Sequence, residues 1–309
     1  MDTFLIAIQT VLPLFLVIFT GIFFSRSKAS SEHWIEVLNK YALNIGFPAL
    51  VIASLMHLET GSGSYFKLIL LNSGYIVFCM LMAFPISGLF RLSTIMRRSL
   101  FLILPFGNIA YLGIPVLQNA FGDDILPVAA IISAVFVFWM LTLGIILVES
   151  FGEEKVRTKK LLMSLAQNPL LLSVIIGLTI IVLRIELPTS VEKTIQLFAD
   201  SVTAVVLFSL GIFLGTHKIG KLKDWYPVFI WVGVTMLILP FLFFEVLKLS
   251  GIDAALLRAS VIDAAMPLGL TPYVLSVQYK LKTTLFARIV VLGTLLSMVI
   301  IPMWMVILG

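Results

Sequence analysis

Residues 98–122 read RSLFLILPFGNIAYLGIPVLQNAFG, and residues 258–280 read RASVIDAAMPLGLTPYVLSVQYK. Each stretch is long and apolar enough to cross a membrane, since a spanning helix needs about 20 mostly apolar residues. Each is also interrupted near its centre by proline, which removes a backbone donor, and by glycine, which lets the chain leave helical geometry. The two stretches therefore predict two membrane helices that are broken near the bilayer midplane.

The rest of the chain, 309 residues in all, has the composition of an integral membrane protein. Hydrophobic residues make up 60% and charged residues 12%, and the mean hydropathy is +1.12. A soluble domain has about 25% charged and about 45–50% apolar residues, and disordered segments are poor in apolar residues, so both classes are excluded. No H-E-x-x-H, P-loop or G-x-S-x-G motif occurs. We therefore do not expect an enzyme.

We expect an all-α polytopic membrane protein in which ten helices cross the bilayer. The connections are short, so we expect residues 1–309 to form a single transmembrane domain. The first apolar run follows Asp2 without a basic n-region, and we interpret it as a retained helix rather than a signal peptide. The expected helices lie at residues 3–24, 34–57, 65–90, 97–121, 124–149, 161–183, 190–215, 225–248, 254–279 and 284–308.

The basic residues predict the orientation of these helices. Of 21 Lys and Arg residues, 15 fall in the loops after odd-numbered helices, 5 fall in the loops after even-numbered helices, and Lys40 lies inside the second helix. Basic loops face the cytoplasm. We therefore expect the loops after odd-numbered helices in the cytoplasm and both termini on the outer side of the membrane. Topology accounts for the net charge of +5 without a nucleic-acid partner.

The two halves of the chain resemble each other weakly. Pro13 and Gly21 have the same eight-residue spacing as Pro169 and Gly177, and the broken helix is the fourth in each half. Five helices per half is an odd number, so the second half must be inverted. Inverted repeats with discontinuous helices recur in secondary transporters, whose substrate sites lie near the midplane. We expect repeat one at residues 1–149, a cytoplasmic connection at 150–160 and repeat two at 161–309.

The two breaks predict an anion site. Half-helix N-termini present free N–H groups and positive dipole ends, which bind small anions. Asn108 lies in the first break, where its side-chain amide can donate to a carboxylate. We expect the substrate to bind at both breaks, where the candidate residues are Asn108, Ile109, Gly113, Pro115, Pro267, Leu268 and Gly269.

Two carboxylates well away from the ends of the expected spans indicate ion coupling. A charged side chain costs about 2.5–3.5 kcal/mol at the centre of an inserted helix, so each carboxylate needs a cavity or a partner. We hypothesise that Asp263 or Asp200 carries a coupling proton or helps to hold a sodium ion; the alternative is a structural hydrogen bond between helices. Asn44 and Gln278 are weaker candidates for the same support pocket. With one cysteine and three scattered histidines, the chain offers no metal cluster, so we expect no cofactor beyond H⁺ or Na⁺.

Several segments together resemble the auxin efflux carrier family, which includes plant PIN-type auxin exporters and bacterial malate and malonate carriers. The resemblance implies two inverted five-helix repeats whose broken helices 4 and 9 cross at the midplane and bind an anion, in an architecture like that of NhaA and the bile-acid symporters. It also implies a polar support pocket near Asp200, and related folds are often homodimers. The segments that carry it are NKYALNIGFPALVIASL (39–55), LPFGNIAYLGIPVLQNAFG (104–122), AQNPLLLSVIIGL (166–178), FADSVTAVVLFSLGIFLG (198–215) and AAMPLGLTPYVLSVQYK (264–280).

The chain departs from the plant pattern in two ways. Asp263 replaces an uncharged polar residue, which suggests cation coupling, and no long central loop separates the halves. Both differences favour a bacterial inner-membrane carrier and count against auxin itself as the physiological substrate. We expect a carrier of a mono- or dicarboxylate that works by an elevator-type exchange in the bilayer, and auxin-like acids are further candidate substrates. A sodium-coupled carrier of the bile-acid-symporter type and a membrane-embedded sensor are the alternatives.

Overall fold

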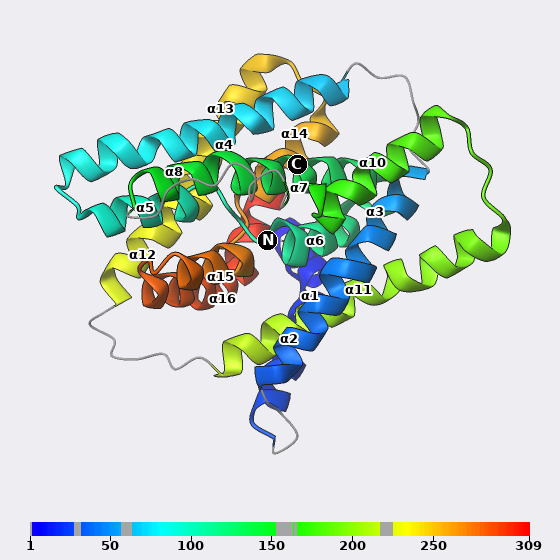
Figure 1. Ribbon diagram of the computed structural model, residues 1–309, viewed down its shortest axis with the longest axis horizontal. Coiled ribbons are helices and arrows are strands. Elements are labelled where there is room, and N and C mark those ends of the chain that lie inside the picture. Colours follow the sequence, from blue (N-terminus) through cyan, green and yellow to red (C-terminus); the bar gives the residue numbers. More distant parts are fainter. Residues whose placement is uncertain (1, 28–31, 57–63, 153–162, 164–165, 217–224) are drawn as a thin grey trace. The chain divides into compact units, whose positions relative to one another are not determined.

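The computed structural model describes residues 2–27, 32–56, 64–152, 163, 166–216 and 225–309, and nearly all of them are helical (Figure 1). The described residues contain no β-strand; one isolated antiparallel bridge joins Gly107 to Leu268. Parts of the expected connection 150–160 and the start of the expected helix 161–183 lie outside the described residues, as do many of the basic loop residues.

Within the described ranges, seven helices are long and apolar enough to cross a membrane, and they coincide with seven of the ten expected spans. They cover Ala7–Ser25, His33–Met56, Tyr65–Leu89, Asp123–Ser150, Thr189–Thr216, Tyr226–Ser250 and Thr283–Leu308. The other three expected spans contain shorter helices: α10 (Pro169–Val182) and the two stretches broken by proline and glycine. The expectation of an all-helical polytopic membrane protein is confirmed.

The chain divides into two compact units. Unit 1 comprises Met1–Gly63, Ala110–Ala134 and Ala166–Lys218, and unit 2 comprises Ser64–Ile109, Val135–Leu165 and Ile219–Gly309. Unit 1 contains α1 (Asp2–Ser25), α2 (Glu32–Tyr41), the π-helical η1 (Ala42–Gly46), α3 (Phe47–Met56), α6 (Ile114–Phe121), the 3₁₀ turn η3 (Asp123–Ile125), α10 and α11 (Thr189–Thr216). The π-helical η2 (Ile109–Gly113) and α7 (Leu126–Trp139) run from one unit into the other.

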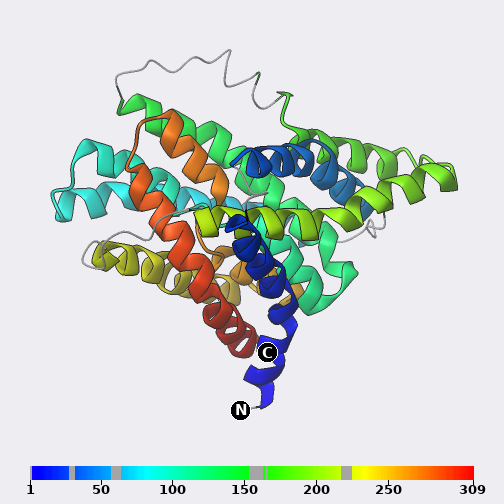
Figure 2. The same cartoon turned by 90° about the horizontal axis from the view of Figure 1, so that it is seen from below.

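In unit 1, α1 packs closely along α11, as Figure 2 shows for the dark blue and yellow-green helices. The helices meet at Gly21 and Gly211, where a Cβ on Gly211 would lie 2.8 Å from Cα of Gly21 and would also clash with the Ile18 carbonyl. Small residues allow membrane helices to approach closely. A polar contact joins α11 to α2 as well, since the Ser209 hydroxyl donates to Asn39 Oδ1 at 2.8 Å.

Unit 2 contains the remaining helices. They are α4 (Ser64–Leu89), α5 (Thr94–Ile103), η4 (Met140–Gly144), α8 (Ile145–Ser150), α12 (Tyr226–Gly233), η6 (Val234–Ile238), α13 (Leu239–Ser250), α14 (Ala254–Ala264), α15 (Leu270–Gln278) and α16 (Thr283–Leu308). The orange α15 and red α16 lie side by side (Figure 1). Buried polar groups join distant helices: Trp304 Nε1 donates to the Met236 carbonyl at 2.9 Å, and the Tyr279 hydroxyl donates to Glu149 Oε1 at 2.8 Å.

The Gly21–Gly211 contact gives the first testable prediction. We expect Gly211→Ala to lower the stability of the protein by about 1–3 kcal/mol, because an added methyl group in a packed interface forces the backbones apart. Thermal unfolding of the detergent-purified protein measures the change. Gly74→Ala on α4 is the matched control, since nothing lies within 4 Å of its added Cβ. Equal melting temperatures for the two variants would contradict the packing role of Gly211.

Candidate functional site

The two broken helices of unit 2 pair with each other through their backbones. Helix α5 ends at Ile103 and α14 ends at Ala264, and each is followed by five non-helical residues, 104–108 and 265–269. Gly107 lies opposite Leu268 in an antiparallel bridge. The Asn108 N–H donates to the Pro267 carbonyl at 2.6 Å, and the Gly269 N–H donates to the Phe106 carbonyl at 3.2 Å. We call residues 104–108 and 265–269 the crossing.

The sequence favours this pairing because proline and glycine stand where the two segments meet. Pro267 has no N–H of its own to satisfy, and its carbonyl is free to accept. A Cβ on Gly107 would lie 3.0 Å from both the Met266 Cβ and the Met266 carbonyl oxygen, and one on Gly269 would lie 3.0 Å from the Gly107 carbonyl oxygen. Only residues without a side chain allow so close an approach of the two backbones.

The pairing leaves donors directed away from the bridge. Gly107 and Leu268 face each other as a non-hydrogen-bonded pair, so their own N–H groups do not bond across it. The Asn108 side chain is buried, and its amide nitrogen has no hydrogen-bond partner in the described part of the chain. Helix α15 begins at Leu270, and no side chain caps its N-terminus. The crossing therefore offers several N–H donors but no cation.

A buried carboxylate lies two residues before the crossing. Asp263 on α14 is 0% exposed, and neither of its oxygens has a hydrogen-bond partner among the described residues. One turn earlier, Ser260 accepts from Asn72 Nδ2 of α4 at 3.0 Å. Two further buried oxygens in unit 2, Asn72 Oδ1 and Thr294 Oγ1 of α16, lack partners in the same described segments. Buried polar groups without partners are costly, so each of these oxygens is a candidate to bind a proton or a cation.

The structure brings together some of the residues expected from sequence and not others. Asn108, Pro267, Leu268 and Gly269 meet in the crossing, and Ile109 follows directly as a buried residue at the start of η2. The other candidates lie elsewhere: Gly113, Pro115, Asn44 and Asp200 belong to unit 1, and Gln278 is the exposed last residue of α15.

The two candidate carboxylates differ sharply in their surroundings. Asp200 is exposed, and its Oδ1 accepts from Gln196 Nε2 at 2.6 Å. The Asn44 amide is likewise engaged, since its Nδ2 donates to the Lys40 carbonyl at 2.8 Å. Asp263, by contrast, is fully buried, and its carboxylate has no partner in the part of the chain that the structure describes. Of the two candidate carboxylates, Asp263 is therefore the one held in the interior without compensation by these residues.

Sequence reasoning missed three polar residues of unit 2: Asn72, Ser260 and Thr294. Asn72 and Thr294 lie within apolar membrane-spanning helices, and Ser260 lies three positions before Asp263, on the same face of its helix. Because polar residues inside a spanning helix are rare and functional, Asn72 and Thr294 could have been identified on that ground. Ser260 could have been identified from the sequence only after Asp263 had been chosen as a candidate, because it lies on the same face of that helix.

Comparison with known proteins agrees with the helical membrane fold. The sequence pattern of the family described as "Membrane transport protein" matches residues 6–305. The chain belongs to this family, the auxin efflux carriers. It is therefore a multi-pass membrane transporter of the auxin efflux carrier type.

Relatives occur in plants, archaea and bacteria. The chain is 30% identical over 149 residues to the probable auxin efflux carrier component 3b of Oryza sativa subsp. japonica, a match that covers 47% of this chain and 25% of the rice protein. It is 22% identical to an uncharacterized transporter of Methanocaldococcus jannaschii, over 97% of this chain and 98% of the relative. The uncharacterized transporter YfdV of Escherichia coli (strain K12) is also 22% identical, over 96% of both chains. The chain thus spans a quarter of the plant relative but nearly all of the two microbial ones.

The close approach of the two backbones at the crossing is testable. We expect Gly269→Ala to destabilise the protein by about 1–3 kcal/mol, because the new Cβ would press on the Gly107 carbonyl and weaken the backbone pairing. Thermal unfolding in detergent measures this loss. Gly88→Ala, with nothing within 4 Å of its added Cβ, is the control and should melt as the native protein does. An unchanged melting temperature in Gly269→Ala would show that the two backbones can move apart at the crossing without loss of stability.

Proposed function

We propose that this protein is a secondary active transporter of a small organic anion, a mono- or dicarboxylate, that works by elevator-type alternating access. The observation that carries the proposal is the crossing, where two interrupted membrane helices meet around the buried, unpartnered amide nitrogen of Asn108. A carboxylate would accept from that amide and from the N-terminus of α15. Because no Lys or Arg lies in the crossing, dipoles and neutral donors would hold the anion. An anion held by neutral donors alone would bind weakly enough to be released on the other side of the membrane.

The proposal extends to coupling. Asp263 lies close to the crossing along α14, and a carboxylate near an anion site repels the substrate unless a proton or a cation neutralises it. Occupation of Asp263 by H⁺ or Na⁺ would therefore favour anion binding, and release of one would favour release of the other. Coupling of this kind makes an ion gradient drive transport.

Two reciprocal contacts support the proposed inverted repeat. In unit 1, α1 packs on α11 at Gly21, and α10 packs on α3, where a Cβ on Gly177 would lie 2.8 Å from Leu55 Cδ1. These helices are the first and seventh, and the sixth and second, of the ten expected spans. In an inverted repeat of five spans, the first span corresponds to the sixth and the second to the seventh. The contact between spans 1 and 7 therefore corresponds to the contact between spans 6 and 2. We accordingly propose ten spans, with both termini in the periplasm of a bacterial inner membrane.

A sodium-coupled carrier of the bile-acid-symporter type is the second candidate. It is favoured by the oxygen-only set of unpartnered buried groups on Asp263, Asn72 and Thr294, because sodium prefers oxygen ligands. Strict sodium dependence with a bulky sterol-like substrate would identify it.

The role of Asn108 gives a direct test. We expect Asn108→Ala to abolish carboxylate-evoked currents in proteoliposomes, or to lower the apparent affinity at least tenfold, because the substrate loses a buried donor worth about 1.5–3 kcal/mol toward a charged group. Solid-supported-membrane electrophysiology with mono-, di- and aromatic carboxylates measures the effect, and labelled uptake detects electroneutral exchange. Asn119→Ala, which changes an exposed amide on α6, is the control. Full activity in Asn108→Ala would overturn the proposed site.

Coupling is tested separately at Asp263. We expect Asp263→Asn to bind substrate but to lose its dependence on a pH or sodium gradient, because the amide is neutral at every pH and lacks the charge that attracts a cation. Uptake into vesicles under imposed H⁺ or Na⁺ gradients distinguishes the two ions. Asp200→Asn is the matched control and should stay coupled, since Asp200 is exposed and bonded to Gln196. Gradient-driven uptake that persists in Asp263→Asn would remove this residue from the coupling mechanism.

A further inference from the structure

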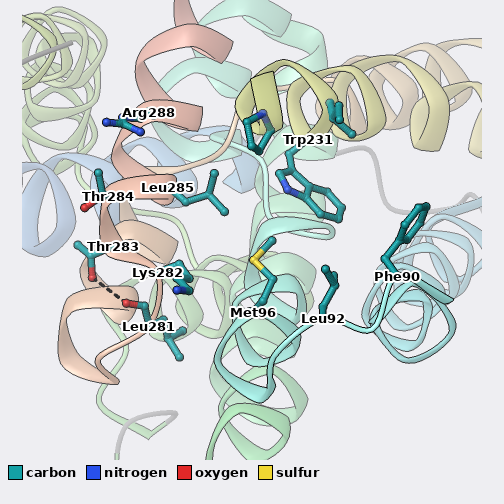
Figure 3. Close-up of a pocket in the computed structure, with 12 residues that line it drawn as sticks. Phe90, Leu92, Met96, Trp231, Leu281, Lys282, Thr283, Thr284, Leu285 and Arg288 are labelled. Carbon is teal, nitrogen blue, oxygen red and sulfur yellow. Dashed lines mark hydrogen bonds between the residues drawn. The ribbon is translucent and has the colours of Figure 1, made fainter. Parts of the chain in front are cut away.

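Unit 2 holds a cavity that is separate from the crossing. It has a volume of about 770 Å³ and lies among the α4–α5 connection, the first turns of α12 and the beginning of α16 (Figure 3). Sites for small ligands have volumes of about 300–1,000 Å³. None of the residues 104–108 or 265–269 lines it, so it is distinct from the proposed substrate site.

The walls of the cavity are mostly apolar, with two cationic side chains among them. Eight of the twelve described residues that line it are apolar, including Phe90, Met96, Trp231 and Leu285. Lys282 and Arg288 line the α16 side, opposite Phe90 (Figure 3). The cavity therefore suits a molecule with an apolar body and an anionic head.

The cavity lies at the level of the membrane surface. Its three segments stand at the ends of membrane-spanning helices: one span ends at Leu89, another begins at Tyr226 and a third begins at Thr283. Phe90 is 67% exposed and Ile230 is 47% exposed beside it. In a membrane protein, such exposed apolar side chains face lipid. The occupant must therefore be able to enter from the bilayer near its headgroups.

We propose that this cavity binds an anionic phospholipid, with one acyl chain against Phe90, Met96, Trp231 and Leu285 and the phosphate beside Lys282 and Arg288. Basic pockets between membrane helices are typical binding sites for anionic lipid headgroups. The N-terminus of α16, which has no acidic residue in its first turn, adds positive potential at the same place. A neutral lipid would gain nothing from these cations, and a small soluble anion would leave the apolar walls empty.

Native mass spectrometry of the purified protein with equal amounts of phosphatidylglycerol and phosphatidylcholine tests the proposal. We expect phosphatidylglycerol to bind preferentially to the native protein. The double variant Lys282→Gln, Arg288→Gln should bind it about 20-fold more weakly, because each basic residue near a headgroup contributes about a factor of five. Lys193→Gln, an exposed charge change on α11 in unit 1, is the control and should bind as the native protein does.

A cavity-filling variant separates the apolar contact from the charges. Leu285→Trp keeps both cations but occupies the space of the acyl chain, so we expect it to lose phosphatidylglycerol as well. Size-exclusion chromatography and thermal unfolding establish that each variant is folded. If Leu285→Trp unfolds, Met96→Trp replaces it as the cavity-filling variant. Equal binding of the two lipids, or unchanged binding in the double variant or in the filled variant, would overturn the proposal.

Competition experiments distinguish a phospholipid from soluble molecules that carry a phosphate or a carboxylate group. Glycerol 3-phosphate supplies the headgroup without chains, and we expect it not to displace the lipid. Displacement by glycerol 3-phosphate at equal concentration would show a soluble-phosphate site instead. Displacement by a short carboxylate that the protein transports would show that the cavity belongs to the transport path. Either result would overturn the lipid assignment.

Discussion

The fold of unit 2 depends on the backbone pairing of two helices that cannot remain helical. A break in a membrane helix frees N–H and C=O groups that lipid cannot satisfy. Here each break satisfies the other, since the Asn108 N–H bonds to the Pro267 carbonyl and the Gly269 N–H bonds to the Phe106 carbonyl. Neither interruption is stable alone in the bilayer, because each supplies the partners that the other has lost. This mutual requirement holds the ends of α5, α14 and α15 together in one place.

The packing around the crossing follows from the same requirement. Backbones that exchange hydrogen bonds must approach closely, so glycine stands at Gly107 and Gly269, and also at Gly293, where a Cβ would lie 3.0 Å from the Pro267 Cβ. Close approach leaves little room for water, and the polar side chains held nearby are therefore buried. The carboxylate of Asp263 and the amide nitrogen of Asn108 consequently lack partners among the described residues. A site that binds an anion and a cation in turn needs groups of this kind.

Two levels of the membrane have different chemistry in unit 2. The crossing presents neutral donors and one buried carboxylate near the middle of interrupted helices, whereas the cavity beside Lys282 and Arg288 lies where three spans end. Helix α16 contributes to both, since Gly293 packs on Pro267 and the cavity is formed around the first two turns of the same helix. A lipid bound at one end of α16 would thus touch the helix that supports the crossing.

The sequence alone determined the membrane class, the approximate spans and the two breaks, because these depend on composition and on the local chemistry of proline and glycine. It also identified Asn108, Pro267, Leu268 and Gly269, which lie within the breaks themselves. Only the tertiary structure decided that Gly107 faces Leu268, that Gln196 satisfies the exposed Asp200, and that Asp263 lacks a partner beside Asn72 and Ser260. Gly107 and Leu268 are 161 positions apart. Residues so distant are brought together by helix packing, which leaves no periodic pattern in the sequence.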